Sequence, residues 1–210
     1  MKSRDMNRGR AGMRVHSGFS MIEVLVALMI VVLGLMGLAG MQVRMQQAEF
    51  ESYQRAQALV LMQDMVDRIQ LHRVTASCFR FTNATSGSPF LGTSATHTAA
   101  CAASTGNDNT QAVSSMTGWN SALTGAAETK GGAAVGAMVG ARGCVSYDAA
   151  SELTDSGGAF ISGTGLYTVA VAWQGTTDTI VPTVNCANGL FTAEARRRVV
   201  STQFRLPYLR

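Results

Sequence analysis

The stretch HSGFSMIEVLVALMIVVLGLMGLAGM, residues His16–Met41, decides the fold because it predicts a long apolar helix. Between Phe19 and Met41 the only charged residue is Glu23. A helix of this length, at about 1.5 Å per residue, spans a bilayer core of roughly 30 Å. No later stretch is as apolar, so the sequence predicts one membrane-spanning segment. A single carboxylate inside such a segment needs an explanation.

The positive charge of the chain lies before this helix. The net charge is +4, from 17 basic and 13 acidic residues. Five of the basic residues and one acidic residue lie in residues 1–18, so 12 of each remain in the rest. Because basic residues stay on the cytoplasmic side of a membrane, we expect a cytoplasmic N-terminus and an exported C-terminal part. The balanced charge of that part argues against a strongly basic nucleic-acid-binding surface.

Three interpretations of this N-terminal segment differ in how they explain Glu23. A secretory signal peptide would use Gly37–Ala39 as its small-residue cleavage site, and a plain membrane anchor would need no cleavage. Both leave Glu23 as an unexplained cost, on the order of 2 to 3 kcal/mol at mid-bilayer and less near the edge. Cleavage after Gly18 explains it. The new ammonium group of Phe19 would then lie one helical turn from the carboxylate, in this chain or in a neighbouring subunit.

The sequence GFSMIEVLVAL, Gly18–Leu28, resembles the class III signal of type IV prepilins and type II secretion pseudopilins. The resemblance implies a leader, residues 1–18, that prepilin peptidase removes on the cytoplasmic side of the inner membrane. It also implies that the same enzyme N-methylates Phe19, and that Glu23 is the assembly carboxylate. The chain would begin as a single-pass inner-membrane protein and later belong to a pilus at the cell surface.

Helical periodicity continues beyond the apolar segment. Residues 42–73 contain no Pro or Gly and are rich in good helix formers. Apolar residues at spacings of 3, 4 and 3 form one stripe: Leu59, Met62, Val66 and Ile69. We therefore expect one helix from about Phe19 to about Leu71. Residues 19–41 would lie in the membrane or the filament core, and the amphipathic residues 42–74 would pack against a globular head.

The head, residues 75–210, is predicted to be loop-rich and then β-stranded. Residues 75–140 are dominated by Ala, Ser, Thr and Gly, with one short helix expected at Val113–Leu123. Alternating apolar and polar residues predict three antiparallel strands, with residues 177–184 as a candidate fourth. The three strands are expected in residues 143–148, 166–175 and 196–206. The fold class is therefore α+β, a helical spine packed against a C-terminal antiparallel sheet with loop-rich insertions, which also resembles pilins.

Four cysteines in the exported part indicate two disulfides. No metal site is expected, because no pair has C-x-x-C spacing and no histidines cluster near them. Spacing alone leaves three connectivities open. We favour Cys78–Cys101, which would close the loop after the helix. We pair this with Cys144–Cys186, which would join the first strand to the loop before the last, as in the C-terminal loops of many pilins.

Within the pilin-like proteins, several features resemble the PilV-type minor pilins, also called type IV pilus modification proteins. These features are the IEVLVAL variant, MVDRIQLHR at the end of the helix, Trp119 with Leu123, GCVSYD and VAWQG. The resemblance implies a structural subunit that primes or enters the pilus, supporting twitching motility and adhesion. Its expected partners are prepilin peptidase, other minor pilins, the major pilin and the inner-membrane assembly platform. A minor pseudopilin of type II secretion is the closest alternative.

Two other functional classes were considered. An enzyme is not expected, because the chain has no G-x-S-x-G, no P-loop and no metal-ligand cluster, and no cofactor is expected either. Asp148, Glu152 and Asp155 are acidic residues in a Ser- and Gly-rich region, where turn formation is the usual role. A surface- or DNA-binding module on the pilus would rely on the basic run Arg196–Arg198, whose alternative role is a solvated strand entrance or a contact with a neighbouring subunit. The neutral charge of the exported part makes nucleic-acid binding the weaker alternative.

Overall fold

The computed structural model describes residues 18–126, 128–134, 136 and 138–208. The expected leader therefore lies outside the described residues except for Gly18. The chain divides into two compact units, residues 1–46 and residues 47–210. Helix α1, Met21–Leu71, is one continuous helix of 51 residues and contributes to both units. This confirms the long helix, and the boundary between the units lies close to the predicted change from apolar to amphipathic sequence at residue 42.

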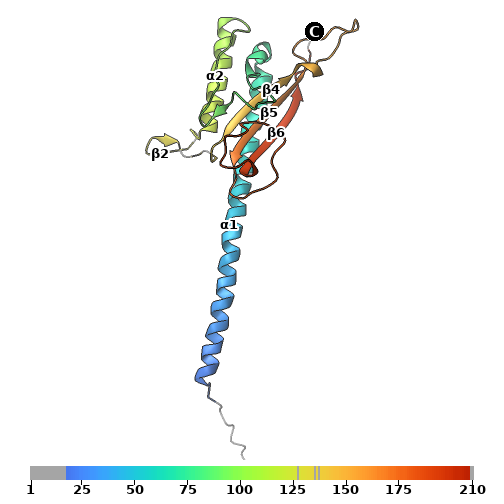
Figure 1. Ribbon diagram of the computed structural model, residues 1–210. Helices are drawn as coiled ribbons and strands as arrows, with labels where there is room; N and C mark the ends of the chain where they lie inside the picture. The colour runs from blue at the N-terminus through green and yellow to red at the C-terminus, as the bar shows by residue number, and fades with distance from the viewer. Residues whose placement is uncertain (1–17, 127, 135, 137, 209–210) are drawn as a thin grey trace, which may run out of the picture. The chain divides into compact units, whose positions relative to one another are not determined.

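The second unit contains a four-stranded antiparallel sheet (Figure 1). Its strands are β1 (Leu91–Gly92), β4 (Arg142–Asp148), β5 (Leu166–Gln174) and β6 (Arg197–Arg205), in the order β1-β4-β5-β6. The central strand β5 pairs with β4 from Leu166 to Ala172 and with β6 over its whole length. The α+β class and the three long predicted strands are therefore confirmed.

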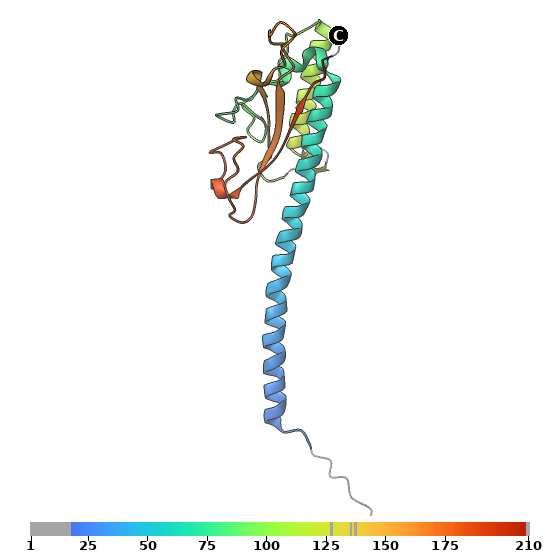
Figure 2. The ribbon, with the colours of Figure 1, turned by 90° about the vertical axis from the view of Figure 1, so that its right-hand side faces the viewer.

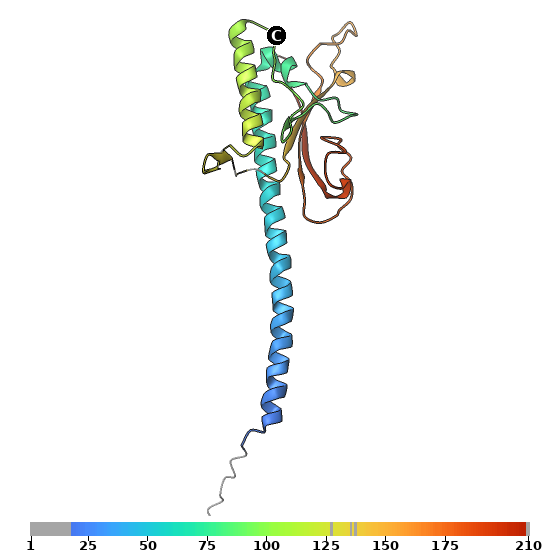
Figure 3. The same ribbon diagram turned by 60° about the vertical axis from the view of Figure 1, so that its left-hand side comes forward.

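Two helices cover one face of this sheet. Helix α2 (Gly106–Leu123) and residues 47–71 of α1 lie side by side against it (Figures 2 and 3). The indole Nε1 of Trp119 on α2 donates a hydrogen bond to the Leu61 carbonyl oxygen of α1 at 2.8 Å. Alternate residues of β5 point into the core between sheet and helices: Tyr167, Val169, Val171 and Trp173 are all buried. This is the β5 face that the alternation predicted.

The apolar stripe of α1 differs from the prediction at one position. Met62, Val66 and Ile69 are buried as expected, but Leu59 is 44% exposed. Ala58 and Met65 are fully buried in its place. The observed buried set follows helical spacing as closely as the predicted set does; its members are residues 58, 62, 65, 66 and 69. The small side chain of Ala58 lets the helix approach the core closely. The inclusion of Leu59 in the predicted stripe was therefore an error of phase.

The opposite face of the sheet carries a second, smaller core. Ala170 and Ala172 of β5 pack there against Phe90 and against the disulfide between Cys144 and Cys186. A second disulfide joins Cys78, in the short 3-10 helix Arg73–Phe79, to Cys101 in the loop before α2. These are the two pairs that the sequence analysis favoured. Because the small alanines leave room on this face, loops rather than helices cover it.

Several local predictions were incomplete or wrong. The short helix begins at Gly106 rather than Val113, because polar residues at its start hid its first two turns. Residues 177–184 form a loop and not a fourth strand. The true fourth strand is β1, whose two residues pair with Arg142 and Gly143 and carry too little pattern to be recognised. A two-stranded hairpin, β2 (Thr129–Lys130) and β3 (Ala133–Ala134), was also missed in the Gly- and Ala-rich tract.

Candidate functional site

The candidate processing and assembly residues lie at the start of α1. Gly18 and Phe19 precede the helix, and Phe19 is 84% exposed. The Ser20 carbonyl oxygen accepts hydrogen bonds from the backbone N–H groups of Glu23 (3.0 Å) and Val24 (3.3 Å), and the Ser20 hydroxyl accepts one from the N–H of Ile22. Glu23 therefore lies in the first helical turn, where a carboxylate also interacts favourably with the positive end of the helix dipole.

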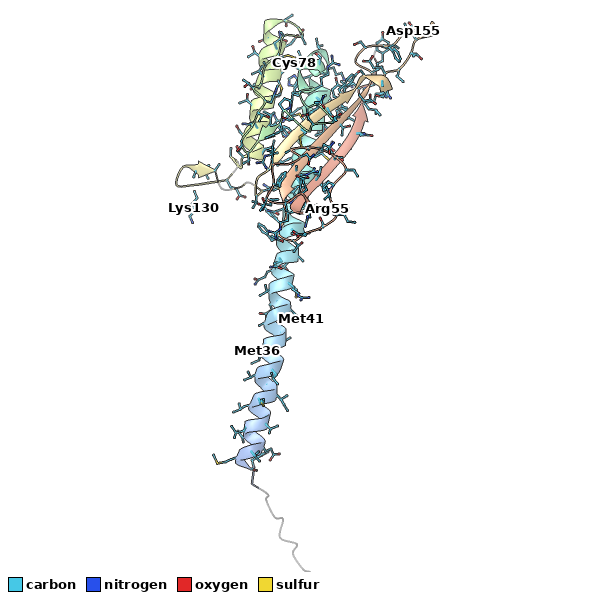
Figure 4. The ribbon with its side chains drawn as sticks, viewed as in Figure 1. Met36, Met41, Arg55, Cys78, Lys130 and Asp155 are labelled. Atoms are coloured by element: carbon cyan, nitrogen blue, oxygen red, sulfur yellow. A yellow bond between two sulfur atoms is a disulfide. The ribbon has the colours of Figure 1, made fainter. Side chains whose placement is uncertain are left out.

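The first unit presents apolar side chains on every side of its helix. Every described residue from Gly18 to Phe50 is exposed, including Leu25, Leu33 and Met36. Figure 4 shows the side chains of Met36 and Met41 projecting from the helix into open space. Helix α1 is long and apolar enough to cross a membrane, since an 18-residue window of it has a mean hydropathy of 2.7. An isolated helix of this composition requires lipid or other apolar helices around it.

In the second unit, Glu51 joins α1 to the loop between β5 and β6. Its carboxylate Oε1 accepts hydrogen bonds from the Thr176 hydroxyl at 2.6 Å and from the Thr176 backbone N–H at 3.0 Å. The Arg198 guanidinium lies 3.5 Å from the same oxygen. Hydrogen bonding by the Thr176 hydroxyl, the largest effect, holds the pKa of Glu51 below its ordinary value. The ionised carboxylate therefore ties the helix to the end of the sheet.

The basic run Arg196–Arg198 makes contacts within the chain. Arg197 is buried, and its guanidinium donates to Glu194 at 2.6 Å and to the Val184 carbonyl oxygen at 2.6 Å. Arg196 pairs with Asp178 at 2.7 Å, and Arg198 donates to the Thr177 carbonyl oxygen at 2.7 Å. The alternative role as a solvated strand entrance is wrong for Arg197. The three guanidinium groups hold the β5–β6 loop in place.

The acidic residues near β4 also have separate local partners. Glu152 accepts a hydrogen bond from the Tyr147 hydroxyl at 2.5 Å and another from the Gly163 N–H. The carboxylates of Asp148 and Asp155 each accept backbone N–H groups of their own turns. The Tyr147 hydroxyl bond lowers the pKa of Glu152, while burial raises the pKa of Tyr147. These residues stabilise loops, as expected for turn-forming carboxylates.

Metal-ligating residues do not gather in the described part of the chain: no group of three His, Cys, Asp or Glu lies close enough to hold an ion. The two histidines in the described part of the chain, His72 and His97, contact groups that are not metal ligands. The ring of His97 stacks on Phe81 at 4.3 Å, and burial lowers its pKa. His72 lies 2.8 Å from the Ser115 hydroxyl and so connects the end of α1 to α2.

Sequence reasoning missed the contacts that join distant segments. The contacts of Glu51, Arg197 and Gly143 within the chain were not predicted, because they join separate segments of the sequence. The polar composition of residues 176–179, placed between two predicted strands, was the only available signal for the Glu51 contact. Nothing in the local pattern distinguishes the buried Arg197 from the neighbouring arginines.

Comparison with known proteins identifies the N-terminal segment. Residues 13–39 match the family model of the prokaryotic N-terminal methylation motif. The match includes Gly18, Phe19 and Glu23, so the chain carries the class III signal of type IV pilin-like proteins. No curated protein and no solved structure matches the chain. The motif together with the apolar helix is consistent with anchoring in a membrane.

Proposed function

We propose that the chain is a minor pilin of the PilV type, a structural subunit that primes or enters a type IV pilus. The observation that carries the proposal is the methylation motif on a helix whose apolar side chains are exposed on all sides. Such a helix is suited to two apolar environments in succession, first the bilayer and then a bundle of similar helices. Its single carboxylate is suited to pair with an amine in either place.

In this proposal, prepilin peptidase removes residues 1–18 and methylates the new terminus at Phe19. The chain is first held in the inner membrane by residues 19–41, with its N-terminus cytoplasmic. Residues 42–74 then form the amphipathic part of the helix, and residues 75–210 form the periplasmic head. The subunit next joins other minor pilins and the major pilin at the inner-membrane assembly platform. Because a buried carboxylate is stable only when paired, Glu23 sets the position of one helix against the next.

The same signal also occurs in minor pseudopilins of type II secretion, so the branch of the family rests on the second unit. The pilus branch is favoured because minor pseudopilins with a similar leader are usually shorter and lack a loop-rich head with four cysteines, whereas this head has two disulfides and an 18-residue helix. A DNA-binding role finds less support, because the three arginines of the one basic run already have partners within the chain. A structural role needs no catalytic group and no cofactor.

The test compares processed protein and filaments in the host cell. The intact mass of the exported protein should begin at N-methylated Phe19, and Gly18→Leu should leave the leader attached. Glu23→Gln removes the charge at nearly constant shape. It should leave processing and membrane insertion unchanged while reducing the amount in sheared filaments at least about tenfold, which corresponds to about 1.4 kcal/mol.

Glu49→Gln is the matched control, because Glu49 lies on the same helix, is exposed and lies outside the apolar segment. It should enter filaments at the wild-type level. Normal incorporation of Glu23→Gln would remove the assembly role. A deletion strain with normal pili and motility but impaired secretion would favour the pseudopilin alternative.

A further inference from the structure

One edge of the sheet carries no neighbouring strand in the described part of the chain. Strand β6 is terminal in the order β1-β4-β5-β6 and pairs only with β5 (Figure 1). The β5–β6 loop lies against the start of this strand, since the N–H of Thr179 donates to the carbonyl oxygen of Ala195, just before β6, and Arg198 of β6 donates to the Thr177 carbonyl oxygen. The uncovered part of the edge begins beyond this loop, at Val199.

The hydrogen-bond pattern shows which backbone groups of β6 point outward. The N–H of Gly175 donates to the carbonyl oxygen of Arg196 at 2.8 Å, and in the same register Trp173 lies opposite Arg198. In an antiparallel pair the residues alternate between facing the partner strand and facing away. Even-numbered residues of β6 therefore bond to β5. The N–H and C=O groups of Val199, Ser201 and Gln203 point away from β5. No backbone group of another described residue forms a hydrogen bond with them there.

This outward edge lacks the usual protection against pairing. Natural edge strands carry proline, inward-pointing charges or bulges, or are covered by other elements. Residues 199–204, VVSTQF, contain no proline and no charge, and they are rich in residues that favour strands. Ser201 and Gln203 are exposed. An edge with this composition is suited to receive a further strand, as in peptide recognition by β-augmentation.

A pocket of about 360 Å³ lies beside the same edge. It is lined by Val199 and Val200 of β6, by Trp173 of β5, and by Arg55 of α1, which Figure 4 labels. The indole Nε1 of Trp173 is buried without a hydrogen-bond partner among the described residues. Arg55 is exposed and forms no ion pair with a described residue, whereas the neighbouring Arg198 is held by Thr177 and Glu51. The pocket therefore offers an unused cation, the Arg55 guanidinium.

The charge beside this edge favours a partner other than a second copy. Arg55 is exposed and forms no ion pair with a described residue. The β6 strand of a second copy would bring no carboxylate to it, because no Asp or Glu occurs between residues 196 and 208. Arg197 and Arg205 are already held within the chain, by Glu194 and by carbonyl oxygens of neighbouring loops. A partner strand with a carboxylate beside it is therefore complementary to this edge.

We propose that the outer edge of β6, from Val199 to Gln203, binds an edge strand from the head of a different pilin-like subunit. This inference rests on the proposed function and adds the place and mode of one subunit contact. The partner strand extends the sheet by bonding to the backbone of Val199, Ser201 and Gln203. A carboxylate beside that strand pairs with Arg55 at the pocket.

The experiment uses the full mature chain in detergent, mixed separately with the purified mature major pilin and with each other minor pilin of the same cell. Residue-resolved hydrogen exchange is measured with and without each partner. In the free protein, the even-numbered amides of β6 should exchange slowly and those of residues 199, 201 and 203 quickly. In one of the complexes the three odd-numbered amides should slow at least about 100-fold, because each has gained a backbone bond.

Variants test the same contact by affinity. Ser201→Pro removes an outward N–H but no bond to β5, and it should weaken binding about tenfold, while Ser201→Ala should bind as the wild type. Arg55→Gln should also weaken binding. The slow exchange of the even-numbered amides verifies that the Ser201→Pro sheet is intact. If that variant does not fold, the exchange measurement on the wild type decides.

Three outcomes would overturn the inference. A complex that leaves the amides of residues 199, 201 and 203 unprotected would show docking elsewhere, and the proposed pilin function would stand. Protection of these amides in the concentrated protein alone would show that the occupant is a second copy. Binding to none of the pilins would reject the contact, whereas the proposed function itself is decided separately by the incorporation of Glu23→Gln into filaments.

Discussion

The replacement Gly143→Ala tests how α2 is packed against the sheet. Gly143 lies in β4, directly under the ring of Trp119. A Cβ atom built on Gly143 would lie 2.1 Å from Cη2 and 2.5 Å from Cζ3 of Trp119, and 2.7 Å from Cδ1 of Leu123. Non-bonded carbon atoms normally remain about 3.5 to 4.0 Å apart. Alanine at this position therefore requires Trp119 or the strand to move by more than 1 Å, on the order of the missing separation.

Movement of Trp119 has two costs. Forcing an extra methyl group into a well-packed core costs about 1 to 3 kcal/mol. Trp119 is fully buried and its N–H donates to the Leu61 carbonyl oxygen at 2.8 Å, so a shifted ring also strains or loses this bond. A buried hydrogen-bonding group left without a partner costs about 1 to 3 kcal/mol. We expect Gly143→Ala to lower the free energy of unfolding by about 3 kcal/mol, since the two costs share one relaxation.

The assay is thermal unfolding of the mature chain in detergent, followed by near-UV circular dichroism of the tryptophans. In a unit of this size each kcal/mol corresponds to about 2 to 4 °C, so the midpoint should fall by about 6 to 12 °C. Gly106→Ala is the matched control. Gly106 is the exposed first residue of α2, and a Cβ atom built on it meets nothing within 4 Å. A Gly143→Ala midpoint within about 1 °C of the control would refute the packing of Trp119 on β4.

The remaining predictions concern contacts outside this cluster. Glu51→Gln should lower the free energy of unfolding by about 1 kcal/mol near neutral pH. Because the pKa of Glu51 is lowered in the folded protein, its stabilising contribution is complete above the ordinary value of 4.5 and is lost as the pH falls through the folded value. The thermal melts of variant and wild type should therefore converge in acid. Replacing Cys144 and Cys186 by serine opens a loop with a sequence separation of 42 and should cost about 4 kcal/mol in a urea titration, and an unchanged midpoint would contradict this. Arg197→Lys should cost about 2 kcal/mol in the same titration without changing retention on DNA, since this guanidinium is buried.

The elements with strong periodicity could be predicted from the sequence. The unbroken apolar run gave the first part of α1, and strict alternation gave the buried face of β5. In both cases the pattern repeats over many residues, so a single exception does not change the assignment. Leu59 shows the limit of this reasoning. Several sets of residues at spacings of three and four describe nearly the same helix face, and only the packed core selects among them.

Contacts between distant segments could not be predicted in the same way. The pair Glu51 and Thr176 depends on the register of α1 against the sheet, which no local pattern encodes. The role of Gly143 depends on the position of Trp119, which comes from a different helix. Residues 177–184 have the composition of a strand, yet Arg197 and Arg198 bind carbonyl oxygens of this segment and hold it as a loop. Tertiary contacts therefore override local strand propensity here.

In the proposed function, the candidate assembly site differs from these contacts because its main partner is created by processing. Before cleavage after Gly18, the nitrogen of Phe19 is part of a peptide bond and carries no charge. Glu23 would then lack a terminal ammonium group beside it, and its transfer into an apolar helix bundle would be costly. Cleavage would supply an ammonium group four residues away and change the sign of this balance. In the proposed function, an uncleaved subunit is therefore excluded from the filament by the cost of its own unpaired carboxylate, and removal of the leader must precede assembly.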